Sequence, residues 1–411
     1  MNLGSLFSGE AFEARDGIMQ QARQRQLTQQ LFRLIDGETT DMAPSSYANT
    51  VDTYTDPGQM RREVDELFLK RPLNLALTAD LPNPGDCLAV DHLPVPVLLT
   101  RDRDGKVHAF FNVCRHRGAQ LIQGRVSGKR SIACPYHAWG YGLDGSLRAV
   151  PFEAGFEDCK RDSMGLRTLP VAERDGLIWV VPTAGAEIDL DAMLGSLQGD
   201  IASYGFQDFV HFETRQISVA MNWKLVVDTF LESYHISYLH KPSIHPIIQS
   251  NRALFEDHGE HLLTVYPRWS FNEQPREAPE DWDFIKHTVM VYILFPNTVL
   301  IVQGDHLEFF RVYPEKGNPD RSVMDVALYT PEPIVTDSAR RHWQNNMDLL
   351  IRVVCTEDFP LGETIQHSFH SGAQDAVTFG RNEPALQHYH QTIRKSLNLP
   401  HGNQSDAVAA E

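Results

Sequence analysis

The sequence predicts an α+β protein in which a small antiparallel β domain precedes a larger domain whose antiparallel sheet is covered by helices. Short β-type runs separated by Gly- and Asp-containing turns fill residues 51–182. The residues after 182 mix strand patterns with long helical patterns. A length of 411 residues also exceeds that of one ordinary domain, so two or three domains are expected.

Residues 1–50 are predicted to be an N-terminal helical extension that packs on the larger domain. Between residues 16 and 37, apolar side chains recur among charged and amide side chains, as in an amphipathic helix. The small domain, residues 51–182, should begin with a short helix near residues 59–68. Its clearest predicted strands are residues 96–100, 107–113 and 177–181.

The larger domain is predicted to span residues 183–411. Its sequence alternates between helical periodicity and β-rich runs, which favours an antiparallel sheet covered by helices. The expected helices are residues 190–204, 223–239 and 337–367, and the expected strands are residues 212–220, 288–295, 298–303, 306–313 and 322–329.

Composition excludes several classes of protein. Thirty-seven basic and 54 acidic residues give a formal charge of −17, which opposes binding to nucleic acid. No apolar run approaches the length of a membrane helix, and residues 1–30 have no apolar segment typical of a secretion signal. We therefore expect no membrane span and a cytoplasmic location. Cys87, Cys159 and Cys355 show no disulfide spacing and are expected to be reduced, partly buried thiols.

Two short motifs each contain one cysteine and one histidine. They are Cys114-Arg-His116 and Cys134-Pro-Tyr-His137. A Rieske [2Fe-2S] cluster uses two thiolates on one iron and two imidazoles on the other, which suits a relay of single electrons. Structural zinc is the alternative, but zinc sites usually pair cysteine with cysteine and histidine with histidine. The alternation therefore favours the iron-sulfur cluster.

A second candidate metal site follows Asp228 and includes His235 and His240. Histidines five residues apart lie about 140° apart on a regular helix, too far to share one ion. The predicted helix must therefore loosen or end between them, and Pro242 shows that it stops nearby. Two imidazoles and one carboxylate form the facial triad of non-haem Fe(II) oxygenases. By itself this spacing is weak, but an electron relay in the same chain strengthens it.

The sequence resembles the large (α) subunits of Rieske non-haem iron oxygenases, the aromatic ring-hydroxylating dioxygenase superfamily, over most of its length. Two segments of this chain are similar to the cluster loops of that family: Cys114-Arg-His-Arg-Gly118 and Cys134-Pro-Tyr-His-Ala-Trp139. Ala138 stands where the family often has glycine. The resemblance implies a Rieske domain and a catalytic domain of the helix-grip (START-like) type. The residues similar to the family's iron motif are Asn222-Trp-Lys224, Asp228, Glu232, Tyr234, His235 and His240.

By this resemblance, Cys114, His116, Cys134 and His137 bind the [2Fe-2S] cluster, and His235 and His240 bind the mononuclear Fe(II). The third iron ligand should be a carboxylate on the last long helix.

Asp358 is the best candidate for that carboxylate, because residues 358–366 resemble the family's Asp-x4-Glu-x2-Gln arrangement. Its neighbour Glu357 is the rival. Asp228 and Tyr234 are expected to support the site rather than react.

Glu232 stands where the family commonly has aspartate. In the family this carboxylate links an iron-ligand histidine to a cluster-ligand histidine of the neighbouring subunit. The resemblance thus implies that Glu232 bridges His235 and His137 of a neighbouring protomer and keeps both rings oriented. Glutamate also occurs there in some monooxygenases of the family, and its longer arm leaves the geometry open.

The implied activity is hydroxylation or oxidative demethylation of a small organic substrate with O2. The sequence lacks a dinucleotide-binding G-x-G-x-x-G motif in a βαβ unit, so NAD(P)H must act through a separate flavin and iron-sulfur reductase, with or without a ferredoxin. A homotrimer is expected, and a β subunit stays open. The alternatives are a dioxygenase that makes cis-dihydrodiols from aromatic rings, or, in another class, an electron carrier or zinc-stabilised binding protein.

Overall fold

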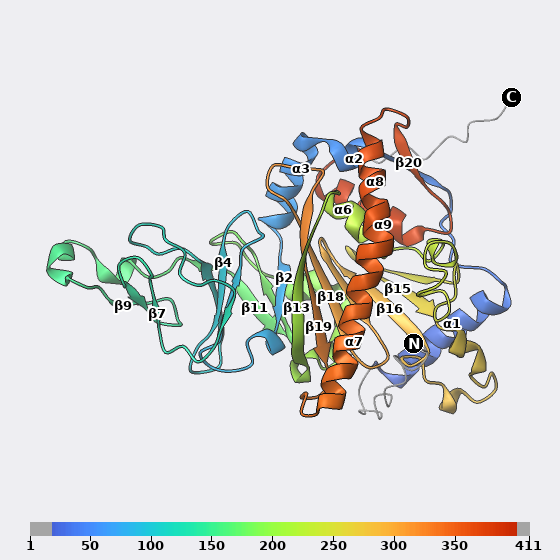
Figure 1. Cartoon of the computed structure of the whole chain (residues 1–411), viewed down its shortest axis with the longest axis horizontal. Helices are drawn as coiled ribbons and strands as arrows, with labels where there is room; N and C mark the ends of the chain where they lie inside the picture. Colours follow the sequence, from blue (N-terminus) through green and yellow to red (C-terminus); the bar gives the residue numbers. More distant parts are fainter. Residues whose placement is uncertain (1–18, 401–411) are drawn as a thin grey trace. The chain divides into compact units, whose positions relative to one another are not determined.

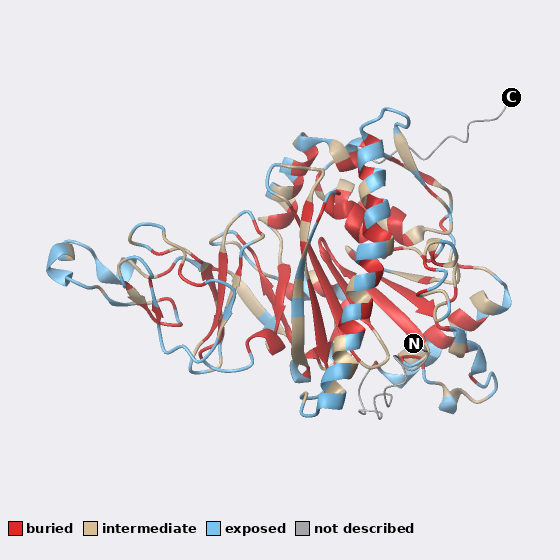
Figure 2. Ribbon diagram, in the orientation of Figure 1, coloured by how far each residue is buried: buried red, intermediate tan, exposed pale blue. Residues whose placement is uncertain are grey.

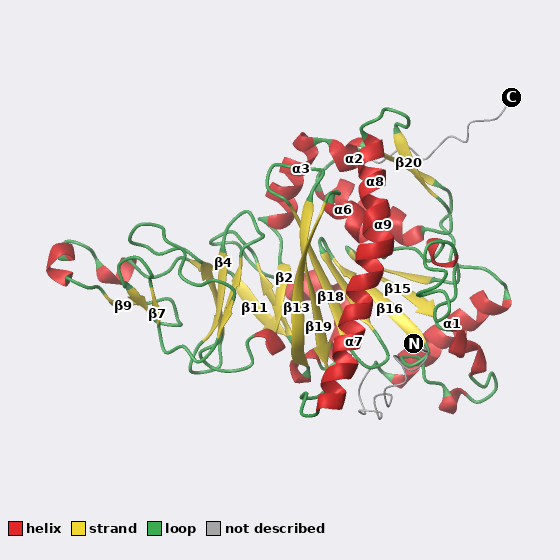
Figure 3. Ribbon diagram, viewed as in Figure 1, coloured by secondary structure: helices red, strands yellow, loops and turns green. Residues whose placement is uncertain are grey.

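The computed structural model describes residues 19–400 and divides into two compact units (Figure 1). The smaller unit contains Glu63–Leu190 and Phe206–Asp208. The larger unit contains the described residues up to Arg62, Asp191–Gly205 and the described residues from Phe209 onward. Helices and antiparallel strands are both abundant, as the sequence predicts (Figure 3). The predicted α+β class is confirmed.

The smaller unit is built from three antiparallel sheets with the orders β10-β5-β4-β3-β6, β11-β12-β2 and β7-β8-β9. β4 and β12 are buried along their whole length, and both lie where the sequence predicts strands. The strands are β2 (Leu73–Leu77), β3 (Cys87–Val90), β4 (Val97–Arg101), β5 (Val107–Phe111), β6 (Arg125–Val126), β7 (Ile132–Ala133), β8 (Gly140–Tyr141), β9 (Leu147–Ala149), β10 (Thr168–Leu169), β11 (Val171–Arg174) and β12 (Leu177–Val180).

A seven-stranded antiparallel sheet with the order β13-β19-β18-β17-β16-β15-β14 forms the centre of the larger unit. Its central strands are buried along their whole length (Figure 2). The strands are β13 (Val210–Val219), β14 (Leu254–His258), β15 (His261–Pro267), β16 (Thr288–Leu294), β17 (Thr298–Val302), β18 (Leu307–Pro314) and β19 (Ser322–Thr330). A separate two-stranded sheet joins β1 (Tyr47–Thr50) to β20 (Ala376–Phe379).

Helices surround this sheet. The long helical stretch that begins with α7 crosses one face of it (Figure 1). The helices are α1 (Gln21–Asp36), α2 (Asp52–Thr55), α3 (Pro57–Glu63), α4 (Leu190–Leu194), α5 (Gln198–Ser203), α6 (Trp223–Asp228), α7 (Asp337–Val353), α8 (Phe359–Phe369) and α9 (Pro384–Ser396). None of the helices in residues 19–400 has the length and apolar character needed to cross a bilayer.

One side of the seven-stranded sheet faces α7. Arg215 of β13 pairs with Asp348 of α7 at 2.7 Å, and the strand registers place Arg215, Val326 and Phe310 on the same side. The Phe310 ring packs against Phe230, with 4.7 Å between centroids. We call this surface the α7-facing side of the sheet.

The predicted helix over residues 223–239 is wrong beyond Asp228, where α6 ends. The carboxylate of Glu232 accepts the backbone N–H groups of Tyr234 and His235, which a continuing helix would direct to carbonyl groups one turn back. A 3₁₀ turn at His235–Ser237 follows. The chain therefore leaves the helix before the first histidine, rather than between the two histidines as expected.

The helix predicted within residues 16–37 is found as the continuous helix α1, but two other predicted helices are interrupted. Residues 190–204 form α4, a 3₁₀ turn and α5, and residues 337–367 form α7, a π-helical turn at Val354–Asp358 and α8. All five cysteines are free thiols. Cys87 is buried, but Cys159 and Cys355 are exposed, so the expectation of partial burial is wrong for these two.

Two candidate metal centres

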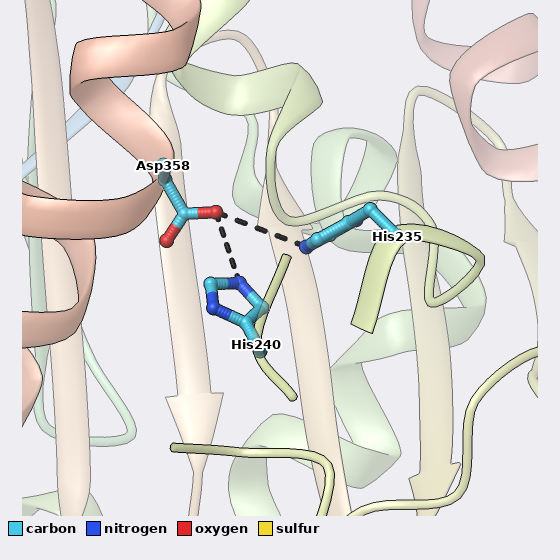
Figure 4. A group of neighbouring side chains, drawn as sticks. All are labelled: His235, His240 and Asp358. Carbon is cyan, nitrogen blue, oxygen red and sulfur yellow. Dashed lines mark ion pairs between the residues drawn. The ribbon is translucent and has the colours of Figure 1, made fainter. Parts of the chain in front are cut away.

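Three side chains of the larger unit converge on one point. One ligand atom from each of His235, His240 and Asp358 lies within 4.8 Å of the others (Figure 4). Asp358 Oδ1 is 3.0 Å from His240 Nε2 and 3.8 Å from His235 Nε2. His240 and Asp358 are buried, whereas His235 is partly exposed. Two imidazoles and one carboxylate are a donor set that suits Fe(II), and they leave other coordination positions free.

The π-helical turn between α7 and α8 determines which carboxylate joins this group. The turn ends at Asp358, and Pro360 lies in the first turn of α8, where a missing N–H is tolerated. Asp358 is buried and points at the two histidines (Figure 4). The adjacent Glu357, the rival candidate, is not one of the three converging side chains.

Glu357 contacts His240 from the other side of the ring. Its carboxylate lies 2.8 Å from His240 Nδ1 and accepts a hydrogen bond from Ser243 Oγ at 2.6 Å. With Nδ1 engaged, Nε2 faces Asp358. Burial alone would lower the pKa of His240, but Asp358 and Glu357 together raise it above its ordinary value. Surroundings that favour a proton on this imidazole also favour a metal cation there.

Glu232 holds His235 in the same manner. Its carboxylate is hydrogen-bonded to His235 Nδ1, so His235 Nε2 faces Asp358. Carboxylates on the outer ring nitrogens of metal-binding histidines fix ring orientation and raise ligand basicity. Tyr234 contributes its backbone N–H to Glu232, but its phenol ring is 51% exposed and packs edge-on against Tyr238.

Asp228, at the end of α6, belongs to a buried network beside the group. Its two carboxylate oxygens contact Tyr54 Oη at 2.6 Å and His390 Nε2 at 2.8 Å. Burial, followed by the charge of Asp228, raises the pKa of Tyr54 well above its ordinary value, so the phenol stays protonated and donates to Asp228. The network ties α6 to α2 and α9, which the sequence motifs did not anticipate.

The cysteine and histidine motifs of the smaller unit form two similar loops. In each loop the cysteine N–H donates to a carbonyl five residues later, and the cysteine carbonyl accepts an N–H four residues later. The residues four positions after the cysteines, Gly118 and Ala138, have φ values of +79° and +55°. Alanine is strained in this left-handed region, which explains why glycine is common there.

The donor atoms of these loops suit an iron-sulfur cluster. Cys114 and Cys134 are buried, and the rings of His116 and His137 lie 4.6 Å apart. His116 Nδ1 is buried and makes no hydrogen bond within the described residues, as expected of a metal-ligand atom. Tyr141 Oη lies 3.3 Å from Cys114 Sγ, a contact that stabilises a thiolate.

Comparison with known proteins places both sites in one family. Residues 72–170 match the Rieske [2Fe-2S] domain, and residues 206–398 match the catalytic domain of the ring hydroxylating alpha subunit. The oxygenase subunit of carnitine monooxygenase from Escherichia coli K12 is 27% identical over 357 residues, which cover 83% of this chain and 91% of that protein. Choline monooxygenase from Amaranthus tricolor is 27% identical over 84% of this chain and 76% of its own length.

Solved structures show the same fold. The quaternary ammonium Rieske monooxygenase CntA with L-carnitine superposes with a TM-score of 0.73 at 19% identity, covering 87% of this chain and 96% of CntA. Naphthalene 1,2-dioxygenase with bound indole superposes with a TM-score of 0.68 at 18% identity, covering 85% of this chain and 92% of that chain.

The chain belongs to the Rieske non-haem iron oxygenases, as the resemblance predicted, and it is a large (α) subunit of that family. The family's cofactors are a Rieske [2Fe-2S] cluster and a mononuclear iron. Its function is therefore that of an oxygenase component, which takes electrons from a separate reductase, activates O2 and hydroxylates or oxidatively demethylates an organic substrate.

Proposed function

We propose that this oxygenase acts on a quaternary ammonium compound and inserts one oxygen atom into a C–H bond beside the nitrogen. The main support for this substrate class is the similarity to carnitine monooxygenase, which extends over 83% of this chain and 91% of that protein. Hydroxylation at such a carbon gives an unstable carbinol that breaks its C–N bond and releases a tertiary amine. The two electrons that reduce the second oxygen atom of O2 to water come from NAD(P)H through the reductase.

Each candidate site residue has a proposed role. Cys114, Cys134, His116 and His137 hold the cluster, and His235, His240 and Asp358 hold the iron. When bound, the cluster supplies single electrons and the iron supplies the place for O2 activation. Glu232 and Glu357 orient the two iron-binding imidazoles from their outer nitrogens. Asp228 fixes the end of α6 through Tyr54 and His390.

We further propose a homotrimer in which Glu232 links His235 to His137 of a neighbouring protomer. The contact between Glu232 and His235 supports the first half of this bridge. The exposed rings of Tyr234 and Tyr238 beside it offer apolar surface for a partner subunit. A published structure of CntA is described as revealing inter-subunit electron transfer. A reductase, with or without a ferredoxin, and a cytoplasmic location complete the proposal.

A coupled assay tests the substrate class. The purified oxygenase, a compatible reductase and NADH are incubated with carnitine, γ-butyrobetaine, glycine betaine, choline and naphthalene, and the products are identified by mass. We expect oxidation of at least one ammonium compound with one oxygen atom inserted, and no product from Asp358→Ala. A naphthalene product that gains two oxygen atoms, without any ammonium product, would instead support the aromatic dioxygenase alternative.

A further inference from the structure

A second group of charged side chains lies at the hairpin between β17 and β18, in the larger unit. Asp305 and His306 belong to the turn, and Glu308 is the second residue of β18. His342 of α7 and Arg268, which follows β15, complete the group. No step of the proposed reaction uses it.

Hydrogen bonds connect four of these side chains in a row. His306 Nε2 lies 3.0 Å from Glu308 Oε1, and His306 Nδ1 lies 2.6 Å from Asp305 Oδ1. The other oxygen of Asp305 is 3.1 Å from His342 Nε2. Arg268 donates to Gln303 Oε1 at 2.7 Å and to the Thr288 carbonyl at 3.3 Å.

The formal charges in this group cancel at neutral pH. Burial alone would lower the pKa of His306, but the hydrogen bonds that its ring donates to Asp305 and Glu308 raise the pKa to about 9, so the ring is an imidazolium. Burial lowers the pKa of Arg268 to about 10 against the attraction of the two carboxylates, which leaves the guanidinium protonated. The imidazolium of His306 and the guanidinium of Arg268 thus balance the carboxylates of Asp305 and Glu308. The group therefore carries no net negative charge that a bound cation would have to neutralise.

One acceptor atom is nevertheless left over. Glu308 is only 4% exposed, and its Oε2 accepts no hydrogen bond from any residue between 19 and 400. Its cross-strand neighbours Ile301 and Leu328 are apolar, as is Val291 beyond Ile301. A buried carboxylate oxygen without a donor is costly, so a bound group that supplies a donor gains more here than in water.

The position of Glu308 relates this oxygen to the proposed active site. Glu308 lies two residues before Phe310 on the same strand, so both occupy the α7-facing side of the sheet. The Phe310 ring touches Phe230, which stands two residues before Glu232. Trp343 of α7 packs against His306 at 5.7 Å. Glu308 therefore lies between the sheet and α7, the same layer from which Asp358 reaches the histidines.

We propose that Glu308 Oε2 accepts a hydrogen bond from a hydroxyl or N–H group of the organic substrate, and that the enzyme selects substrates carrying such a group at a distance from the oxidised carbon. The inference rests on the proposed function, because it requires that the substrate binds next to His235, His240 and Asp358. His306, held by Asp305, keeps Glu308 aligned through its other oxygen.

Matched ligand pairs that differ in one hydroxyl group test this selection. The pairs are carnitine with γ-butyrobetaine, choline with its methyl ether, and benzyl alcohol with benzyl methyl ether. For the wild-type holoenzyme we expect the hydroxyl member of at least one pair to bind about ten- to a hundredfold more tightly, as for a hydrogen bond to a charged acceptor. In Glu308→Gln the amide oxygen accepts from His306, and the NH2 group takes the place of Oε2. This position then no longer accepts a hydrogen bond, so the affinity ratio should fall to about one.

Glu315→Gln is the matched control, because Glu315 lies just beyond β18 and is paired with the surface residue Arg321. It should keep the wild-type ratio. Both variants should keep their iron content and visible spectrum. Glu308→Asp provides a second variant, which retains the charge but withdraws the oxygen, and an intermediate ratio is expected.

Two results would overturn the inference: no hydroxyl preference in any wild-type pair, or an unchanged preference in Glu308→Gln. If both Glu308 variants fail to fold, the absence of a hydroxyl preference in the wild type still overturns the inference. Failure of the proposed substrate class is distinguishable. In that case no ammonium compound is oxidised, while the benzyl pair still shows the preference and its loss in the variant.

Discussion

Each histidine of the candidate iron site is held through the ring nitrogen that faces away from Asp358. Glu232 takes Nδ1 of His235, and Glu357 takes Nδ1 of His240. With Nδ1 engaged in each ring, both Nε2 atoms face Asp358 and are available to a metal ion. This shared pattern explains why two adjacent acids on one helix, Glu357 and Asp358, have different roles.

Replacing Asp358 with alanine should remove the mononuclear iron and abolish oxygenation. The cluster belongs to the other unit and should keep its visible spectrum. Iron analysis by mass spectrometry together with absorbance would show about one iron lost from about three per chain. An enzyme that retains full iron and activity after this change would transfer the ligand role to Glu357.

Replacing Glu357 with glutamine should weaken iron binding without removing it. The amide still fills the space beside His240 but loses the charge that raises ligand basicity, which typically costs about ten- to a hundredfold in metal affinity. Competition with a chelator measures this affinity. Glu332→Gln, a change at an exposed glutamate of the same unit, should have no effect. Equal affinities in the two variants would contradict the positioning role.

Local motifs and the family resemblance were sufficient to predict His235, His240 and Asp358 as candidate metal ligands, and the structure brings these three side chains together. The distant partners of the supporting residue Asp228 were not predicted. Tyr54 and His390 reach Asp228 across 174 and 162 residues of sequence. Such contacts arise from tertiary packing, which leaves no local pattern in a single sequence.

At the scale of elements, the interruption between α7 and α8 has a clear structural role. One π-helical turn, Val354–Asp358, shifts the register of a helical stretch that otherwise continues from Asp337 to Phe369. The sequence predicts the helix but not this turn, because a π turn differs from an α turn by a single residue. The helix predicted from Trp223 was too long for another reason. The Glu232 side chain accepts hydrogen bonds from backbone N–H groups that a continuing helix would use.

Packing of α8 against the start of α6 gives a test at this scale. A Cβ atom on Gly362 would lie 2.4 Å from Met221 Sδ, and Met221 is fully buried next to the N-cap Asn222. Gly362→Leu should overpack this contact and destabilise the larger unit by about 1–3 kcal/mol. Denaturation followed by tryptophan fluorescence measures the loss.

Gly199→Ala is the matched control for this substitution. Gly199 lies in α5, and a Cβ there meets no atom within 4 Å. Alanine should therefore be neutral or stabilise the protein by up to about 1 kcal/mol through its higher helix propensity. Equal stabilities of the leucine variant and the wild type would show that Met221 moves aside without cost.

Across the whole molecule, the two-part architecture followed from composition and periodicity, but some of its elements did not. The edge strand β14 was missed because its sequence, Leu-Phe-Glu-Asp-His, lacks clear alternation. Helix α9 was also missed, although Pro384 at its first turn is a recognisable start signal. Family resemblance supplied the function, because general sequence patterns alone could not separate an oxygenase from an electron carrier.

The buried imidazolium of His306 should make the stability of the protein depend on pH. Its pKa is about 9 in the folded state and 6.5 in the unfolded chain, so the folded state binds this proton more tightly. The stabilisation is complete below pH 6.5 and is lost as the pH rises to about 9. A shift of this size corresponds to roughly 3 kcal/mol.

His306→Gln removes the titrating group and provides the reference for this effect. The difference in unfolding free energy between wild type and variant, measured by urea denaturation, should be largest near pH 6 and should shrink steadily toward pH 9. Titrating groups that do not interact with His306 contribute equally to both proteins and cancel in this difference. A difference that stays constant over this range would mean that His306 is neutral in the folded protein. The balance of charges around Glu308 would then include one net negative charge, and a cationic substrate group would be favoured there over a neutral donor.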